Sequence, residues 1–586
     1  MAKIKENPEV EKMRHSCSHV MAQAVLQMFP EAKLAIGPSI ADGFYYDFDL
    51  PRTLIPEDLE IIEEKMKKIV KEKQKFEYSE KPIDDALDFY KKVEQNYKFE
   101  LIRDLKDKGE NKVSFYENIG KDGEVKFADL CKGPHVEDTS KIGAFKLVKI
   151  AGAYWRGDEK NKMLQRIYGY CFEDKDKLYQ YIKMMEEAKK RDHREIGKKM
   201  DLFSFQEEGP GFPFWHPKGM ILQNELLKYW REIHEENGYQ EIKTPIILNV
   251  DLWHQSGHYD NYKENMYFTE IDETGYAVKP MNCPGGCLVY KNSMHSYREL
   301  PIRNAELGLV HRHEKSGVLH GLFRVRNFTQ DDAHIFCTTD QMKDEIKNVI
   351  KLCDQVYKKF GYEYHIELST RPEKSIGSDE IWEKAESTMK EIMEELGREC
   401  IINEGDGAFY GPKFDFHLKD CIGRTWQCGT VQLDFSMPER FGLEYTGEDG
   451  KPHRPVMIHR VIFGSLERFI GILIEHFAGD FPLWLAPTQV SIIPVSDKFV
   501  DFARDLKDNL KKFNLRIEID ESQESVGKKI RNAEIMKVPY MLVVGEKEIE
   551  SGKLVVRKYS EKEQKEMKVE EFGEMVKDEI VERKGR

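Results

Sequence analysis

One stretch of the sequence constrains the fold and the chemistry of this chain more than any other. Residues 311–334 read HRHEKSGVLHGLFRVRNFTQDDAH, and apolar and polar side chains alternate in the second half. This period-2 alternation predicts a half-buried strand. Arg312 and Arg324 can bind phosphate or carboxylate through a planar guanidinium, and a carboxylate and an imidazole follow at Asp332 and His334. The stretch therefore predicts a site for an anionic nucleotide and a small polar substrate.

Length and composition predict a protein of several domains. The chain has 586 residues, of which 40% are hydrophobic and 33% charged, and its formal net charge is -14. About three or four domains are expected at this length. An acidic chain is not an obvious nucleic-acid binder, so any contact with RNA must come from local basic patches.

The sequence contains neither a membrane-helix signal nor a leader signal. No run approaches the roughly 20 apolar residues that a membrane helix needs, and residues 1–16 lack the apolar core of a signal peptide. The ten cysteines are scattered, unlike those of a disulfide scaffold. We therefore expect a cytoplasmic protein with no membrane partner.

Changes in composition divide the chain into four expected parts, which together give an α+β multidomain fold. Residues 176–200 read as one charged helix with an apolar stripe, a Gly/Pro-rich stretch follows, and a second break lies near residues 482–489. The first expected part, residues 1–175, has helices at 11–29 and 51–75 and strands within 123–171. A linker helix and connector follow at 176–209. The third part, 210–485, is expected to be an antiparallel sheet with packed helices, and the fourth, 486–586, a small α/β domain with a largely parallel sheet.

Three residues that are far apart in the sequence could form a tetrahedral metal site. They are Cys283 in KPMNCPGG, His334 and His459 in PVMIHR. One thiolate, two imidazoles and an open fourth position suit a catalytic zinc ion. Taken alone, such a trio is more often explained by core packing.

Six strings that surround these residues carry a family resemblance. In order they are KPMNCPG, HRHE…LHGLFRVRNFTQDDAHIF, LSTRPEKSIGSDE, GAFYGPKFDF, RTWQCGTVQLDF and MIHRVIFGSLERFIGIL. Together they resemble the threonyl-tRNA synthetases, a family of class II aminoacyl-tRNA synthetases, over nearly the whole chain. The resemblance implies a class II antiparallel-sheet catalytic core, an α+β editing domain before it and an α/β anticodon-binding domain after it. It also implies a homodimer that joins threonine to threonine tRNA through a threonyl-adenylate made with ATP.

The resemblance assigns roles to residues of the catalytic part. Two anions must approach each other when the threonine carboxylate attacks the α-phosphate, so positioned positive charge is required. Arg312 would hold the α-phosphate and the carboxylate, Arg468 the γ-phosphate, and Arg324 would assist, with Mg²⁺ accompanying ATP. Glu314 would face the adenine. Further matching positions are Gln330, Tyr410, Lys413, Gln427 and Gln432. Ordinary salt bridges remain the structural alternative for the arginines.

The same resemblance implies one zinc ion per subunit on Cys283, His334 and His459. Threonine and valine are nearly isosteric, and an apolar pocket separates such a pair by only about 100-fold. A zinc ion can coordinate both the amino group and the hydroxyl of threonine. Asp332 would accept a hydrogen bond from that hydroxyl, so valine would be rejected.

Serine keeps the hydroxyl and loses only a methyl group, worth about 1–3 kcal/mol, so a hydrolytic editing site is also expected. His15 and His19 lie at i, i+4, and Cys131 and His135 recur in ADLCKGPHVEDT. The resemblance implies that these four residues, with Asp129, form a metal-free pocket that hydrolyses mischarged seryl-tRNA. A second zinc site and a satisfied core cluster remain as alternatives.

The resemblance also implies anticodon contacts from Glu548 and Arg557, with solvated surface charges as the alternative. Gly286 stands where the family usually has histidine and His313 where asparagine is common, and we expect no ubiquitin-like domain before the editing part. A non-catalytic RNA-binding protein is disfavoured because Arg312, Arg468 and the trio are all present. A hydrolase centred on His15 and His19 explains nothing between residues 210 and 586.

Overall fold

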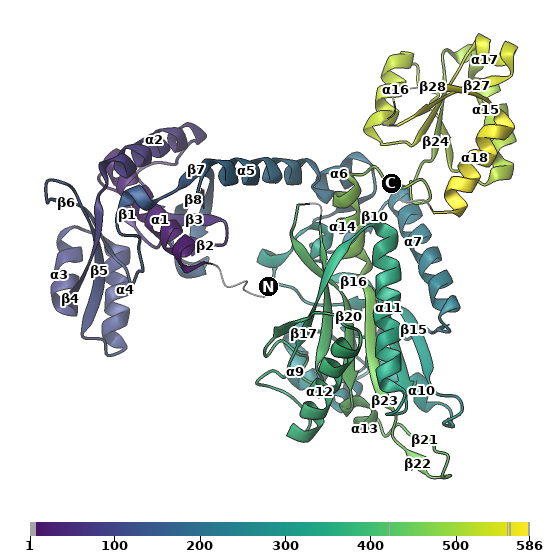
Figure 1. Ribbon diagram of the computed structural model, residues 1–586, viewed down its shortest axis with the longest axis horizontal. Helices are drawn as coiled ribbons and strands as arrows, with labels where there is room; N and C mark the ends of the chain where they lie inside the picture. Colours follow the sequence, from purple (N-terminus) through teal and green to yellow (C-terminus); the bar gives the residue numbers. More distant parts are fainter. Residues whose placement is uncertain (1–6, 421, 560, 562–563, 584–586) are drawn as a thin grey trace. The chain divides into compact units, whose positions relative to one another are not determined.

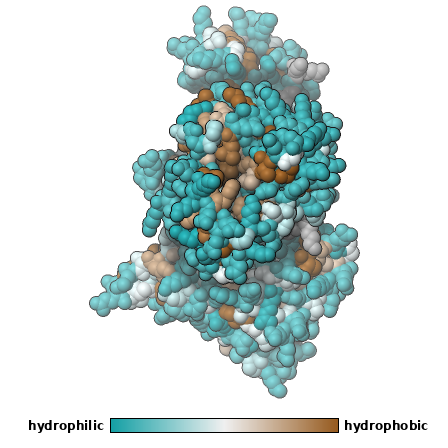
Figure 2. Space-filling view, turned by 90° about the vertical axis from the view of Figure 1, so that its left-hand side faces the viewer, coloured by the Kyte–Doolittle hydropathy of each residue, from teal (hydrophilic) through white to brown (hydrophobic). Residues whose placement is uncertain are grey.

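The computed structural model describes residues 7–420, 422–559, 561 and 564–583. The chain forms two compact units, Met1–Glu186 and Glu187–Arg586 (Figure 1). Hydrophilic side chains cover most of the face shown in Figure 2, with hydrophobic ones gathered near its middle. Within the described residues, no helix combines the length and the hydropathy that crossing a membrane requires.

The first unit contains two antiparallel sheets and the helices that pack on them. The first sheet has the spatial order β1 (Lys33–Leu34), β3 (Gly43–Asp49), β8 (Met163–Phe172) and β7 (Ala144–Tyr154), and β2 (Ser39–Ile40) pairs with β3. The second sheet has the order β4 (Lys75–Pro82), β5 (Lys112–Ile119) and β6 (Val125–Leu130). The helices are α1 (Pro8–Met28), α2 (Pro56–Glu72), α3 (Ile83–Lys92) and α4 (Asn96–Asp107), and α5 (Lys175–Lys190) begins in this unit and ends in the second. The helices expected at 11–29 and 51–75 and the strands expected within 123–171 are confirmed.

Helix α1 begins where the sequence provides a start signal. The Asn7 side chain accepts a hydrogen bond from the Glu9 amide at 3.1 Å, and Pro8 occupies the first turn. The apolar side of α1, including Val20 and Met21, is fully buried in the core of this unit. This packing fixes the rotation of α1 and hence the direction of its two histidines.

The linker expected as one helix over 176–200 is two helices, so that prediction is wrong. Helix α5 ends at Lys190, and α6 spans His193–Lys199. The Asp192 carboxylate accepts a hydrogen bond from the Arg194 amide at 2.9 Å. An aspartate in this position stabilises the start of a new helix, because it satisfies an amide that has no helical partner.

The second unit is built on an eight-stranded sheet. Its spatial order is β11 (Gln240–Glu241), β15 (Ile302–His311), β16 (Asn327–Cys337), β23 (Val456–Ser465), β20 (Thr425–Asp434), β19 (Lys413–Lys419), β17 (Glu363–Ser369) and β18 (Ile401–Asn403). All neighbours are antiparallel except the two edge pairs, β11–β15 and β17–β18. The expected antiparallel core is therefore confirmed.

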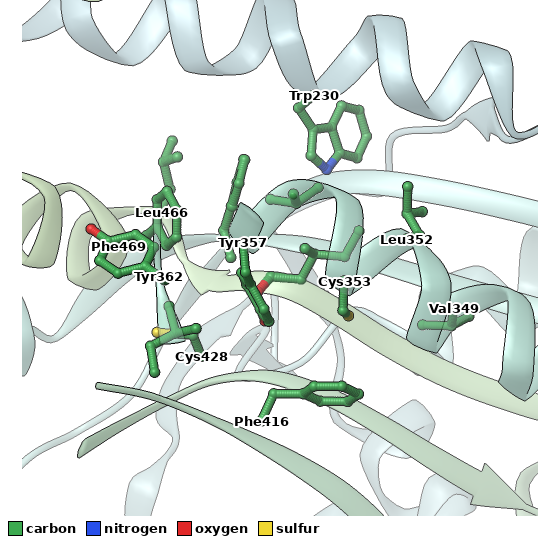
Figure 3. Close-up of a cluster of buried hydrophobic side chains, with 14 of the residues drawn as sticks. Trp230, Val349, Leu352, Cys353, Tyr357, Tyr362, Phe416, Cys428, Leu466 and Phe469 are labelled. Atoms are coloured by element: carbon green, nitrogen blue, oxygen red, sulfur yellow. The ribbon is translucent and has the colours of Figure 1, made fainter. Parts of the chain in front are cut away.

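Besides α6, which contributes Ile196, four helices share one hydrophobic core with one face of this sheet. They are α7 (Pro217–Glu236), α11 (Met342–Phe360), α12 (Asp379–Glu395) and α14 (Leu466–Phe477). Figure 3 shows α11 residues such as Cys353 and Tyr357 between Trp230 of α7 and Phe416 of β19. The polar side chains that could form a functional site lie on the opposite face of the sheet.

Strand β16 exists where the alternation predicted a strand, but it is not half-buried. Every residue from Asp331 to Cys337 is buried. Ala333 and Ile335 belong to the helix-packed core, while Phe336 packs on the other face in a cluster with Cys283 of α10 (Cys283–Lys291). The strand is third in an eight-stranded sheet and is covered on both faces, which a local pattern does not reveal.

The C-terminal part of the second unit has a mixed sheet rather than a largely parallel one. Its order is β25 (Ile517–Ile519), β24 (Val490–Pro494), β26 (Tyr540–Val544), β27 (Lys553–Lys558) and β28 (Gln564–Lys568), with α15 (Val500–Leu510), α16 (Val526–Ile535), α17 (Glu546–Ser551) and α18 (Val569–Val581). Only β25–β24 and β24–β26 are parallel. The link through α17 is too short for a parallel crossover, so the chain turns back antiparallel.

Shorter elements complete the second unit. They are α8 (Val250–Ser256), α9 (His258–Tyr262), α13 (Ser436–Arg440), the pair β9 (Phe203–Phe205) and β10 (Pro213–Trp215), the sheet β12 (Ile247–Asn249), β14 (Thr274–Val278) and β13 (Tyr267–Ile271), and the pair β21 (Tyr445–Thr446) and β22 (Pro452–His453).

Candidate functional site

A cavity of about 520 Å³ opens on the polar face of the eight-stranded sheet. The structure brings nearly all of the predicted catalytic-part residues to its wall. Those that line it are Cys283, Arg312, Glu314, Arg324, Gln330, Asp332, Tyr410, Lys413, Gln427, Gln432, His459 and Arg468. They come from α10, the four strands β16, β23, β20 and β19, the loop between β15 and β16, the segment before β19, and α14.

Two members of the Cys-His-His trio, Cys283 and His459, line this cavity, and His334 lies next to them. His334 of β16 and His459 of β23 are direct cross-strand partners, and Cys283 is the first residue of α10. One ligand atom of each residue lies within 4.8 Å of the others. His334 is 1% exposed, and both of its ring nitrogens are buried without a hydrogen-bond partner. Buried polar atoms are normally satisfied, so these orphaned nitrogens fit a missing ligand.

The electrostatics of the trio also fit a zinc ion. Burial lowers the pKa of His334 well below its usual value, so its imidazole is neutral and can donate a lone pair. Burial raises the pKa of the Cys283 thiol well above its usual value. A thiol in such surroundings loses its proton when a metal cation binds it.

Asp332 is held beside the trio by a neighbouring amide. Its Oδ2 accepts a hydrogen bond of 3.1 Å from Asn282 Nδ2, and Oδ1 lies 3.8 Å from His334 Nε2. A Cβ on Gly308 of β15 would lie 2.3 Å from the Asn282 amide. Glycine at 308 therefore leaves the space that lets Asn282 reach Asp332.

Arg312 and Arg468 present positive charge to the cavity. Arg312 Nε donates to the Pro280 carbonyl at 3.1 Å, and Arg468 donates to the carbonyls of Phe323 and Gln427, each at 3.0 Å. Among the described residues, no ion pair involves either guanidinium. Carbonyl oxygens orient these groups without cancelling their charge, which suits an anionic ligand.

Arg324 differs from these two arginines. Its Nη2 lies 2.9 Å from Glu314 Oε2, so it forms the salt bridge that was the structural alternative in the sequence. Both side chains still line the cavity. The Glu314 carboxylate, which was expected to face the adenine, is therefore paired with the Arg324 guanidinium.

The remaining predicted cavity residues belong to a polar network on β19 and β20. Lys413 forms an ion pair with Asp415, whose other oxygen accepts from Gln427 Nε2 at 2.6 Å. Gln432 Nε2 donates to the Gly411 carbonyl at 3.1 Å. Gln330 and Tyr410 complete the wall, and burial raises the pKa of Tyr410 well above its usual value.

Two buried carboxylates that sequence reasoning left without a role hold the arginine-bearing elements together. The register between β16 and β23 shifts at Asp331, which leaves the amides of residues 462–464 opposite it. The Asp331 carboxylate accepts from all three amides at 2.8–3.2 Å. Glu467 accepts from the Thr329 amide at 2.9 Å. These contacts fix the start of α14 and with it Arg468.

His193 of α6 supports the loop that contacts Arg468. Its Nδ1 lies 2.8 Å from Glu475 Oε1, and its Nε2 accepts from the Leu322 amide at 3.0 Å. The next residue, Phe323, supplies the carbonyl that receives Arg468 Nε. The sequence suggested only a linker here, because a lone histidine at a helix start carries no signal for this tertiary contact.

A second cluster lies in the first unit, where His15 and His19 of α1 meet Cys131 and His135. One ligand atom of each lies within 4.8 Å of the others. Cys131 Sγ is 3.4 Å from His15 Nε2 and 3.3 Å from His135 Nε2. The quartet expected from the sequence is therefore brought together, with three members half-buried and His19 buried.

Hydrogen bonds define the tautomer of His135. The Ser16 hydroxyl donates to the Lys12 carbonyl at 2.8 Å and lies 3.0 Å from His135 Nδ1. Since the only hydroxyl proton is used on Lys12, His135 Nδ1 must donate, which leaves the Nε2 lone pair facing Cys131. Burial lowers the pKa of all three imidazoles and raises the pKa of the Cys131 thiol to about 11. The quartet is thus uncharged near neutral pH.

Asp129 lies behind this quartet rather than within it. Its carboxylate contacts Lys98 Nζ at 2.6 Å and accepts from the Tyr46 hydroxyl at 2.6 Å. His19 Nε2 is 3.8 Å away. Asp129 is buried and compensated by a lysine, so it can act on the quartet through His19.

Comparison with known proteins decides the family. The chain is 60% identical to a threonine–tRNA ligase of Clostridium botulinum over 97% of this chain and 88% of that protein. It is 59% identical to that of Clostridium tetani over 98% of this chain and 90% of that protein. The chain belongs to the threonine–tRNA ligase family. The family resemblance and fold class expected from the motifs are confirmed.

Domain models match three segments of this threonine–tRNA ligase family member. The class II core domain of tRNA synthetases (G, H, P, S and T) matches residues 267–477, the anticodon-binding domain matches 489–579, and the second additional domain of threonyl- and alanyl-tRNA synthetases matches 113–168. A solved structure, the RNA-binding domain of threonyl-tRNA synthetase from Cryptosporidium parvum, is 40% identical with a TM-score of 0.64, and the match covers 66% of this chain and 98% of that one.

The two expected anticodon residues lie in the C-terminal part and already have partners there. Glu548 of α17 accepts from the Gly545 amide at 2.9 Å, and Arg557 of β27 lies 3.2 Å from Glu534 Oε1 of α16. No hydrogen bond or ion pair joins these two side chains within the described residues. The structure thus places them on neighbouring elements without forming a shared site.

The two departures from the family pattern have different surroundings. A Cβ on Gly286 would lie 3.0 Å from His334 Nδ1, so glycine gives the trio more room. His313 is exposed, and its amide donates to the Asn265 carbonyl at 2.9 Å. Of these two positions, only Gly286 therefore lies next to the trio.

Proposed function

We propose that this protein ligates threonine to threonine tRNA in an ATP-dependent reaction that passes through a threonyl-adenylate, and that it hydrolyses mischarged seryl-tRNA. One observation carries the proposal: two guanidiniums oriented by carbonyls share a cavity with a buried Cys-His-His trio. Anion binding and recognition of a small polar substrate are therefore combined at one place.

Arg312 and Arg468 neutralise the anions that must meet. The carboxylate of threonine attacks the α-phosphate of ATP and pyrophosphate is the leaving group, whose charge Mg²⁺ bound with ATP would help to neutralise. Arg312 holds the α-phosphate and the carboxylate, and Arg468 holds the γ-phosphate. Arg324 assists at the phosphates, and Glu314, positioned by Arg324, faces the adenine.

Cys283, His334 and His459 would hold one zinc ion per subunit. Bound there, zinc supplies Lewis-acid coordination for the amino group and the hydroxyl of threonine. Asp332 accepts the hydrogen bond of the substrate hydroxyl and is kept in place by Asn282. Valine lacks this hydroxyl and would leave the Asp332 carboxylate without its partner.

The other cavity residues position the substrates. Lys413 and Gln427 share Asp415, which keeps both side chains directed along the sheet face. Gln330, Tyr410 and Gln432 line the part of the wall that receives threonine and the adenylate. None of these side chains needs to transfer a proton, because the carboxylate nucleophile is already ionised.

The uncharged quartet in the first unit performs the editing reaction. Cys131 and His135, whose Nε2 lone pair faces the thiol, together orient a water molecule toward the ester bond of seryl-tRNA. Neutral imidazoles and a thiol could hold either water or a cation, and the family resemblance favours water at this quartet. Asp129 acts through His19, and a zinc ion on the quartet remains the alternative.

The domain division follows the same roles. We propose residues 1–175 as the editing domain, 176–209 as the linker, 210–485 as the catalytic domain and 486–586 as the anticodon-binding domain, with Glu548 and Arg557 contacting bases. Exposed Ile246 and Ile247, beside Pro245, support a homodimer that covers them. All described cysteines are free thiols, which supports a reducing cytoplasm.

An aminoacylation assay with purified threonine tRNA and labelled threonine tests this function. The wild-type chain should form threonyl-tRNA, and Arg468→Ala should reduce the rate by about 10²–10³-fold. Arg454→Ala is the matched control, since Arg454 is exposed and pairs with Glu439 at 3.3 Å. No threonyl-tRNA from zinc-loaded protein, or equal rates for both variants, would refute the proposal.

A further inference from the structure

A second pair of imidazoles lies on the same sheet, away from the trio. His365 of β17 and His417 of β19 are direct cross-strand partners. Their ring centroids are 5.1 Å apart, and the rings are nearly parallel at 14°. A register shift between β19 and β20 occurs at His417. Such irregularities redirect a side chain, here toward the neighbouring strand.

A buried carboxylate lies beneath both rings. Glu367 is two residues along β17 from His365 and therefore on the same face. Its Oε1 is 3.0 Å from His365 Nε2, and its Oε2 is 3.6 Å from His417 Nε2. The three ligand atoms lie within 4.8 Å of one another. Asn403 Nδ2 donates to Oε2 at 3.3 Å and orients the carboxylate.

This face of the sheet is the one that carries the active-site cavity. Ile366 and Leu368 alternate with the polar residues and point into the helix-packed core, as does Phe416 next to His417 (Figure 3). His365 and Glu367 therefore lie on the opposite face, in line with Lys413 at the other end of β19. Lys413 is four residues from His417, or about 13 Å along the strand.

The distances and exposures are compatible with a metal site. Ligand bonds of about 2.0–2.2 Å in a tetrahedral site separate neighbouring ligand atoms by about 3.3–3.6 Å. The distance from His417 Nε2 to Glu367 Oε2, 3.6 Å, lies in this range, and the 3.0 Å between His365 Nε2 and Glu367 Oε1 is that of a hydrogen bond, which a metal ion would replace. The Glu367 side chain is 4% exposed, whereas His365 and His417 are 36% and 16% exposed. A cation can therefore enter from solvent and meet negative charge at the bottom of the site.

We propose that His365, Glu367 and His417 bind a divalent transition-metal ion of the zinc type, at a centre separate from Cys283, His334 and His459. Two imidazoles and one carboxylate favour Zn²⁺, Co²⁺ or Ni²⁺ over Mg²⁺ and Ca²⁺, which prefer all-oxygen sites. The ion crosslinks β17 to β19, and its binding stabilises the folded chain.

Cobalt added to enzyme that holds a single zinc ion per subunit, on Cys283, His334 and His459, tests this proposal. Co²⁺ at the proposed centre should give visible d–d absorption without a thiolate-to-metal charge-transfer band, because no cysteine is a ligand there. Cobalt on the Cys131 quartet would show that band, so the two locations are distinguishable. Metal analysis after equilibration with micromolar free Co²⁺ gives the number of bound ions.

Variants decide between coordination and adventitious binding. His365→Ala and His417→Ala should each remove the thiolate-free signal and one bound ion, and Glu367→Gln, which keeps the shape of the side chain, should weaken binding more than about tenfold. His453→Ala is the matched control, because His453 lies 2.9 Å from the Asp449 carboxylate and stacks on Tyr445, and among the described residues it belongs to no cluster of potential metal ligands. Equal cobalt content in all variants, or uptake only at millimolar Co²⁺, would overturn the proposal. Threonine activation by these variants should be retained.

Discussion

His459 Nε2 lies 2.8 Å from Asp434 Oδ2, and this contact decides which ring nitrogen of His459 can bind a ligand. Asp434 is fully buried, and its Oδ1 accepts from the amides of Ser436 and Met437 at 2.7 and 3.0 Å. The carboxylate is therefore held rigidly and accepts the Nε2 proton. The Nδ1 lone pair remains for the trio, in the arrangement common for metal-bound histidines.

Asp434→Asn should weaken zinc binding at the trio by about 10–100-fold, because the amide no longer fixes this tautomer or increases ligand basicity. Competition with a chromogenic chelator measures the affinity. Asp449→Asn removes the carboxylate from the exposed His453 pair and should change nothing. Unaltered zinc affinity in Asp434→Asn would show that His459 does not depend on Asp434.

Cys131→Ser should allow seryl-tRNA to accumulate while threonine activation stays intact. The thiol faces the His135 Nε2 lone pair in the first unit, whereas the catalytic cavity is formed by residues of the second. Deacylation of preformed seryl-tRNA is the measurement, and Cys400→Ser, a half-buried cysteine of the second unit, is the control. Wild-type clearance of seryl-tRNA by Cys131→Ser would remove Cys131 from the editing site.

His193→Ala should lower kcat for adenylate formation by about tenfold to a hundredfold, because the Leu322 amide and the Glu475 carboxylate lose their partner and the loop that contacts Arg468 shifts. His193→Gln should restore most of the rate, since its amide can both accept and donate. Steady-state kinetics with varied ATP separates kcat from KM. A loss of folded protein without a kinetic change would assign His193 a purely structural role.

Acidification should destabilise the second unit in part through His234. Burial lowers the pKa of His234 to about 2, and its Nδ1 donates to the Trp230 carbonyl at 2.6 Å. The unfolded chain takes up a proton below about pH 6.5 and the folded chain does not, so stability is present above that pH and falls by about 1.4 kcal/mol per unit below it. The window extends from about pH 6.5 down toward pH 2.

His234→Phe keeps the ring that stacks on Trp230, with centroids 3.8 Å apart, and removes the titrating group. At pH 8 the variant should be less stable by about 1 kcal/mol, because one hydrogen bond is lost. At pH 5 the difference should vanish or reverse, since the wild type alone has lost about 2 kcal/mol there. Urea unfolding at both pH values measures the difference, and an equal deficit at pH 5 and pH 8 would contradict the assignment.

The sequence predicted those features that depend on local pattern or on matched motifs. The period-2 alternation marked β16, the i, i+4 spacing placed His15 and His19 on one face, and the motifs brought Arg312 and Arg468 to one cavity. The burial of β16 was mispredicted because α10, which covers its second face, begins far upstream at Cys283.

Tertiary contacts account for what the sequence did not predict. Asp331 can accept hydrogen bonds from three amides of β23 only because the register between β16 and β23 shifts there. His193 can accept one from the Leu322 amide only because Leu322 lies against α6. The metal triad of His365, Glu367 and His417 arises from cross-strand register between β17 and β19. None of these pairings is visible in a local window of residues.

The central claim is that a zinc ion on Cys283, His334 and His459 selects threonine by its hydroxyl. Amino-acid-dependent exchange of pyrophosphate into ATP tests this claim most directly. Zinc-loaded enzyme should show exchange with threonine, weaker exchange with serine and none with valine. Removal of zinc by a chelator, or Cys283→Ala, should abolish the threonine signal. Exchange with valine at the threonine rate, or threonine exchange that persists without zinc, would contradict the account.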